Sequence, residues 1–209
     1  MTVPMALVDF VPVALFAAAA ILLQRDLYNK MSKGAFALLA AGTLMILTAG
    51  VYKAAWKLLY ALNVCDFVAL GKTFFPMQTT GFVLTAAALI ALLTHRQGDA
   101  MAVAAAPVLY ESSLLFVVLT VLGTLGMCGS LCAMAKRLKR PSAFALFAAA
   151  FALMLAMGYL SSRDFAEAAM NWIAQGVNIV GQGALLLGVI QLHRAGLANA
   201  DALKKGVNA

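Results

Sequence analysis

The chain has 209 residues, of which 64% are apolar and only 11% are charged. A soluble globular domain carries about 25% charged residues, so this composition excludes an ordinary soluble domain. Long windows without charge alternate with short basic clusters, which is typical of a polytopic α-helical membrane protein. The formal net charge of +7 is spread over the predicted membrane edges, where it meets lipid headgroups, and it does not indicate nucleic acid as a partner.

Six apolar windows reach the length of about 20 residues that a membrane-spanning helix needs. They predict an all-α integral membrane protein with one transmembrane domain over residues 1–194 and a polar C-terminal tail over 195–209. The first basic residue is Arg25, so the first window is expected to be a retained span and not a cleaved signal peptide. The predicted spans are Val3–Gln24, Ala35–Leu62, Phe74–Thr94, Val108–Ala135, Ser142–Ser162 and Met170–Leu192.

The second span ends in a face that combines basic and aromatic side chains. Helical spacings of three and four place Lys53, Trp56, Lys57 and Tyr60 together. One interpretation is an interfacial belt, with rings at headgroup depth and lysines reaching lipid phosphates. The other is a site for an anion or carboxylate, held by the ammonium groups and framed by the rings.

The third and fourth spans carry fewer polar groups. Gln78 shares a face of the third span with Thr85, seven residues on. Glu111 begins the fourth span and is followed by two serines, so it is a candidate for a coupling-ion or proton site. Asp9 lies in the first turns of span one, and both acids occupy positions near helix N-termini, where carboxylates are favoured without any function.

The sixth span contains the most informative pattern in the chain. Asn171, Gln175, Asn178 and Gln182 recur at spacings of four, three and four, which places four amides on one helix face. An unsatisfied amide costs several kcal/mol in hydrocarbon, so this amide stripe is expected to face other helices or a water-filled cavity. It either stabilises helix packing through interhelical hydrogen bonds or lines a site for a polar ligand.

A faint internal repeat aligns Ala35–Gly50 with Ala143–Gly158, and a basic cluster precedes each copy. With three spans in each of the segments 1–96 and 108–194, the halves are predicted to form an inverted repeat, the alternative being a chance match between apolar spans. The positive-inside rule places both termini in the cytoplasm of a cell-membrane protein, because basic residues then divide ten inside to five outside. The inside set is Lys53, Lys57, Lys72, Lys136, Arg137, Lys139, Arg140, Arg194, Lys204 and Lys205, and the outside set is Arg25, Lys30, Lys33, Arg96 and Arg163.

No metal or cofactor site is predicted. The two histidines, His95 and His193, are expected on opposite membrane faces, and Cys128 and Cys132 are interpreted as small packing residues. Three functional hypotheses remain: a transporter or solute-binding permease for a polar or anionic small molecule, a structural or regulatory membrane subunit, and an intramembrane enzyme. The third is the weakest, because the sequence contains no nucleophile–base pair or metal-binding motif. The expected partners are membrane lipids, a small polar or anionic solute, and a second copy of the chain or another membrane subunit.

Overall fold

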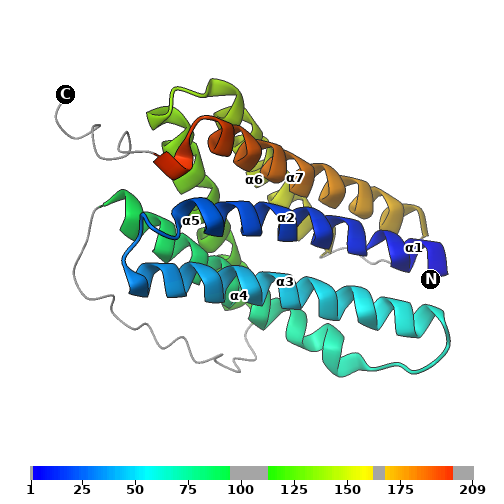
Figure 1. The fold of residues 1–209 in the computed structure, drawn as a ribbon. Helices are drawn as coiled ribbons and strands as arrows, with labels where there is room; N and C mark the ends of the chain where they lie inside the picture. The colour runs from blue at the N-terminus through cyan, green and yellow to red at the C-terminus, as the bar shows by residue number, and fades with distance from the viewer. Residues whose placement is uncertain (1, 95–112, 162–167, 200–209) are drawn as a thin grey trace.

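The chain folds into long helices without any strand in the part that the structure describes. The structure is a computed structural model that describes residues 2–94, 113–161 and 168–199 (Figure 1). Six of its helical segments are long and apolar enough to cross a membrane, with α1 and α2 counted together as the first, which confirms the predicted all-α membrane fold. The helices are α1 (Val3–Val8), α2 (Phe10–Leu27), α3 (Lys33–Ala61), α4 (Val68–Leu93), α5 (Ser113–Arg137), α6 (Pro141–Ser161), α7 (Ala168–Arg194) and the short 3-10 helix η1 (Leu197–Asn199).

The six spans form a closed ring. Each of the helices from α3 to α6 packs mainly against the helix before it and the helix after it, and α7 packs against both α6 and α2, which closes the ring. A ring of this kind surrounds a central axis to which every span contributes one face. The centre of the bundle is therefore the place where polar faces of distant segments can meet.

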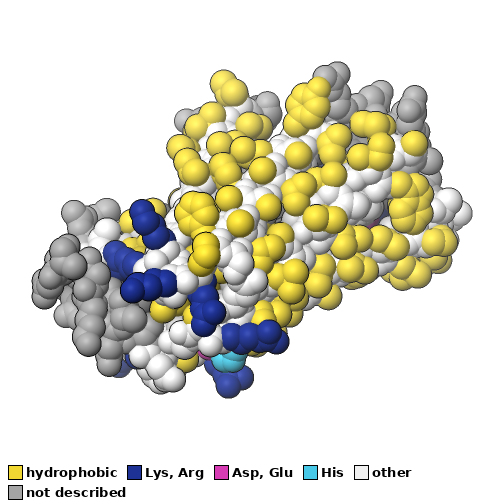
Figure 2. Space-filling view, turned by 90° about the horizontal axis from the view of Figure 1, so that it is seen from above, with side chains coloured by type: hydrophobic (Ala, Val, Ile, Leu, Met, Phe, Trp, Pro, Cys, Tyr) yellow, Lys and Arg dark blue, Asp and Glu magenta, His cyan; other side chains and the backbone are white. Residues whose placement is uncertain are grey.

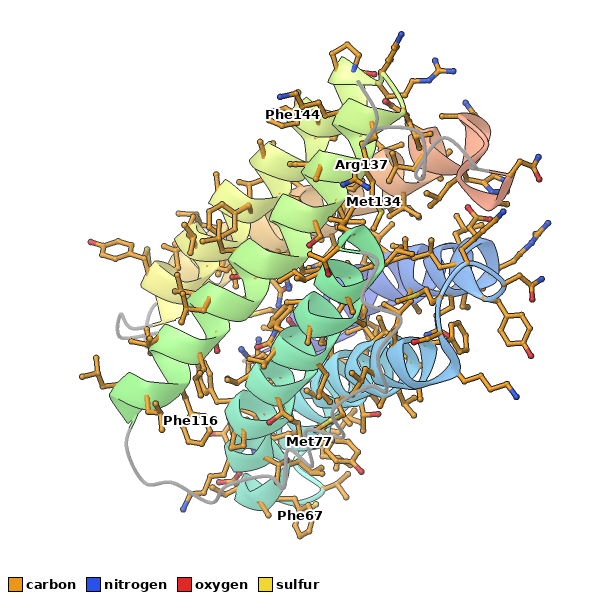
Figure 3. All side chains as sticks on the ribbon, turned by 90° about the vertical axis from the view of Figure 1, so that its left-hand side faces the viewer. Phe67, Met77, Phe116, Met134, Arg137 and Phe144 are labelled. Carbon is orange, nitrogen blue, oxygen red and sulfur yellow. The ribbon has the colours of Figure 1, made fainter. Side chains whose placement is uncertain are left out.

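The helix directions follow from contacts between named residues. Arg137, the last residue of α5, donates from Nη2 to the carbonyl of Leu93, the last residue of α4, at 3.3 Å. The hydroxyls of Thr79 and Thr120, nearer the starts of the same helices, lie 2.6 Å apart. The helices α4 and α5 therefore run parallel, as Figure 3 also shows, with Arg137 beside the end of α4.

Both halves of the chain consequently have the same sequence of directions. In the N-terminal half (α1–α4) and in the C-terminal half (α5–α7), the first and third spans run one way and the middle span runs back, with Ser142 at the start of α6 contacting Gln191 near the end of α7. The predicted inverted repeat is not confirmed, because inverted halves require opposite directions. The matched segments Ala35–Gly50 and Ala143–Gly158 do lie on the middle spans of the two halves, α3 and α6.

The described ends of the chain lie at opposite ends of the bundle (Figure 1). Asp26 near the end of α2 contacts His193 near the end of α7, so α7 ends far from the start of α1. The expectation that both termini face the cytoplasm stays a prediction, because residues 200–209 lie outside the described part of the chain. The two histidines were expected on opposite membrane faces, but α4 and α7 terminate at the same end of the bundle, so the reason for that expectation is removed. His95 itself lies outside the described residues.

Two prolines lie within spans of the N-terminal half, Pro12 in the first and Pro76 in the third. Pro12 has no N–H to donate to the carbonyl of Val8, and the first span divides at Asp9 into α1 and α2. The backbone of Asp9 stays in the right-handed helical region, with φ −60° and ψ −22°. Pro76 lies inside α4, which nevertheless begins at Val68, six residues before the predicted span, because the turns ahead of the proline remain helical.

The tightest helix contact joins α3 and α4. A Cβ atom built on Gly42 would lie 2.5 Å from Thr85 Oγ1 and 2.7 Å from the carbonyl oxygen of Gly81, so only glycine fits there. Small residues allow such close approach between membrane helices. This contact lies in the half of the bundle farther from α1. Buried apolar side chains fill the interior there, among them Phe16, Leu39 and Leu89.

Candidate solute-binding cavity

A cavity of about 810 Å³ occupies the bundle interior toward the end at which α1 begins, here called the N-terminal end. Its volume is within the range of about 300–1,000 Å³ typical of small-molecule sites. All six spans contribute to its wall. The polar and aromatic lining residues are Asp9, Phe16, Lys53, Trp56, Lys57, Phe74, Phe75, Gln78, Phe82, Thr120, Thr124, Tyr159, Asn171, Gln175, Asn178 and Gln182.

The amide stripe of α7 forms one wall of this cavity. All four of its members line it, as the helical spacing requires for one face. Gln182 lies 14 residues beyond the first residue of α7, which is about 21 Å along a helix and near the middle of this 27-residue span. The stripe therefore carries hydrogen-bonding groups from the N-terminal end of the bundle to the depth of the membrane centre.

Two amide oxygens of the stripe have no hydrogen-bond partner among the described residues. They are Oε1 of Gln175 and Oε1 of Gln182, and both atoms are buried. The Gln175 residue as a whole is 5% exposed. A buried acceptor without a partner costs about 1–3 kcal/mol, so these oxygens are poorly explained as interhelical packing contacts.

The basic wall of the cavity is on α3. Lys57 forms an ion pair with Asp9, with 2.7 Å between Nζ and Oδ2, and both side chains are nearly buried. Lys53 Nζ lies 4.1 Å from the centre of the Phe74 ring, a cation–π contact. Both lysines thus line the cavity, Lys57 in an ion pair and Lys53 against an aromatic ring.

The aromatic members of the same α3 face divide between the cavity and the surface. Trp56 lines the cavity and donates from Nε1 to Oδ1 of Asp66 at 2.9 Å. Tyr60 is 49% exposed and is not part of the cavity wall, although its ring centre lies 6.5 Å from that of Trp56. Of the remaining predicted site residues, Gln78 lines the cavity and Glu111 lies outside the described residues.

Asp9 is the cavity residue that the sequence analysis left out of the candidate site. Its position in the first turns of a span has an explanation without function, and periodicity on one helix does not reveal a partner on another. The sequence did offer one indication of this partner. An acidic side chain inside a membrane span needs a basic partner, and Lys53 and Lys57 are the basic residues nearest to the interior of a span. Phe74, Phe75 and Tyr159 also line the cavity without having been predicted, since aromatic residues in apolar spans carry no distinctive pattern.

The opposite end of the bundle, here called the basic end, is closed by side chains. Side chains from three helices, α2, α5 and α7, converge there: Phe16, Leu23, Met127, Leu131, Leu185 and Val189. Polar contacts between described residues of the two halves at this end include Asp26 with His193, with both carboxylate oxygens 3.0 Å from Nδ1, and Arg137 with the carbonyl of Leu93. Figure 2 shows lysine and arginine side chains gathered at this end and an apolar surface along the rest of the visible face.

The fold and the composition define a polytopic α-helical membrane protein with an interior cavity lined by apolar and polar side chains. The chain matches no known family model, and no curated protein or solved structure matches it. The function is therefore argued from the cavity and its charges.

Proposed function

We propose that this protein is a membrane transporter or solute-binding permease for a polar or anionic small molecule, with the cavity as its site. The observation that carries the proposal is the pair of buried, unpaired amide oxygens of Gln175 and Gln182 on a cavity wall. A ligand with N–H or O–H groups satisfies these acceptors. Lys53, which lines the same cavity, supplies a positive charge for an anionic group.

The competing hypothesis, a subunit that acts only through helix packing, predicts different hydrogen bonding for the amide stripe. It requires the amides to be hydrogen-bonded to neighbouring helices, as Gln24 is to Thr43 at 2.6 Å and Ser142 to Gln191 at 2.6 Å. Those two contacts lie away from the cavity and are examples of such packing in this same protein. The contrast between them and the unpaired Gln175 and Gln182 supports the site.

A stability screen with a matched control tests the proposal. The purified protein in mild detergent is melted in the presence of amino acids, hydroxy acids, monocarboxylates and nucleosides. We expect at least one compound to raise the melting temperature of the wild type and of Gln191→Leu, whose amide is outside the cavity wall, but not that of Asn178→Leu. Equal stabilisation of all three proteins, or no stabilisation of the wild type by any compound, would contradict the proposal.

We further propose that the basic end faces the cytoplasm, so that the cavity lies toward the opposite side of the membrane. Among the described residues, eight lysines and arginines are at the basic end and three are at the N-terminal end. The positive-inside rule then places α1 outside and the end of α7 inside. The eight are Arg25, Lys30, Lys33, Lys136, Arg137, Lys139, Arg140 and Arg194, and the three are Lys53, Lys57 and Lys72.

A native cysteine reports this orientation. Cys65 is exposed between α3 and α4 at the N-terminal end, whereas Cys128 is buried and Cys132 is partly buried. In intact cells, a membrane-impermeant maleimide is expected to label the wild type but not Cys65→Ser. Adding Ser32→Cys to that variant places a thiol at the basic end, which is expected to react only after permeabilisation, and the reverse pattern would show that the orientation is wrong.

A further inference from the structure

We infer that Asp9 sets the charge of the ligand, so that the cavity takes an organic anion with a single negative charge. This inference rests on the proposed solute-binding function and adds a substrate class to it. It starts from three charged side chains, Asp9, Lys53 and Lys57, which are the charged members of the cavity wall among the described residues. Their sum is one positive charge.

The charges of Lys57 and Asp9 cancel, because the two side chains form an ion pair. The two charged atoms lie 2.7 Å apart, and the side chains are 12% and 10% exposed. At this distance and burial each group compensates the other. Lys57 is therefore not free to balance a ligand while Asp9 remains in place.

Lys53 is the uncompensated cation. Among the described residues it has no acidic partner within ion-pair distance, and its ammonium group instead lies against the face of Phe74. An aromatic ring stabilises a cation by its quadrupole but leaves the net charge unchanged. A single carboxylate near Lys53 neutralises the charged side chains of the cavity wall, whereas a second carboxylate leaves one excess negative charge.

The other residues of the cavity wall indicate what the uncharged part of such an anion looks like. The ring of Phe74 lies against Lys53, and the rings of Trp56 and Phe75 line the same cavity. Gln175 and Gln182 offer acceptors that are seven residues apart, or about 10 Å along α7. The site is suited to a carboxylate attached to an aromatic or apolar segment that also carries hydrogen-bond donors.

A series of variants changes the net charge of the cavity wall in single steps. The wild type carries +1, Asp9→Asn carries +2, Lys57→Gln carries 0, and the double variant Asp9→Asn/Lys57→Gln returns to +1. Asp26→Asn is the control, because it makes the same chemical change at the basic end, outside the cavity wall. Affinities for the purified full-length proteins are measured by titration calorimetry with two pairs of probes on matched skeletons, benzoate against terephthalate and hexanoate against adipate.

The preference for one or two carboxylates is expected to follow the net charge of the wall. The wild type, the control and the double variant should prefer the monoanions, whereas Asp9→Asn should shift the preference toward the dianions by about tenfold to a hundredfold, as expected for one unit charge at short range. Lys57→Gln should bind both classes weakly. If Asp9→Asn does not fold, recovery of monoanion binding in the double variant relative to Lys57→Gln tests the same dependence.

The failure of this inference is distinguishable from the failure of the proposed function. If the wild type binds the probes but the preference is the same in Asp9→Asn, in Lys57→Gln and in the double variant, Asp9 does not set the ligand charge and the cavity remains a binding site. Retention of full affinity in Lys53→Met likewise overturns the charge argument alone. If neither these probes nor the wider screen of small molecules gives binding to the wild type, the proposed function fails, and this inference fails with it.

Discussion

Replacing Gln175 with leucine separates a binding site from a packing contact. Leucine has a similar volume and removes an amide whose oxygen is buried without a partner in a residue that is 5% exposed. The free energy of unfolding is expected to increase by about 1–3 kcal/mol, which is the usual cost of an unsatisfied buried polar group. For a chain of this length, each kcal/mol corresponds to a rise of about 2–4 °C in melting temperature.

The assay is thermal unfolding of the purified protein in mild detergent, followed by tryptophan fluorescence. Gln24→Leu is the matched control, since Gln24 donates to Thr43 Oγ1 at 2.6 Å and its loss is expected to lower stability by about 0.6–2 kcal/mol. The two glutamine substitutions should thus change the melting temperature in opposite directions. If Gln175→Leu melts below the wild type as the control does, the amide is a packing contact and the reasoning about its unpaired oxygen is refuted.

Two further substitutions test the helix contacts that close the bundle. Gly42→Ala should destabilise the protein by about 1–3 kcal/mol, because the added methyl group overlaps Thr85 Oγ1, whereas Gly129→Ala, which has no neighbour within 4 Å, should leave the melting temperature unchanged or slightly raised. Asp26→Leu should cost about 1–3 kcal/mol through loss of the contact with His193, and Asp26→Asn, which keeps a hydrogen-bonding side chain, should cost less in the same unfolding assay. Equal melting temperatures for the two Asp26 variants would show that the contact contributes no measurable stability.

The features that could be predicted from the sequence are those that one helix determines by itself. The apolar windows predicted every span, and the spacing of three and four placed the amides of α7 on a single face, which the structure directs into a cavity. The same spacing grouped Lys53 with Lys57. Whether these lysines face headgroups or the interior depends on the neighbours of α3, and for that the sequence offered only two open alternatives.

The features that the sequence did not predict arise between helices. The ion pair of Asp9 with Lys57 joins residues 48 positions apart, and no periodicity on either helix indicates it. The relative directions of the two halves were predicted by assuming that every connection reverses the chain, and the parallel packing of α4 and α5 breaks that assumption. The count of basic residues on each side of the membrane used the same assumption, so the orientation proposed here differs from the one that the sequence predicted.

Among the described residues, the cavity wall has one uncompensated positive charge, and this charge has an electrical consequence. When one anion occupies the cavity, the loaded site is neutral, and the membrane potential does little work on it. The potential, worth about 2.3 kcal/mol per elementary charge for 100 mV, acts instead on the empty site, which keeps its charge. In a transport cycle built on this cavity, voltage would therefore control the return of the empty carrier, and the step that moves the solute would be electrically silent.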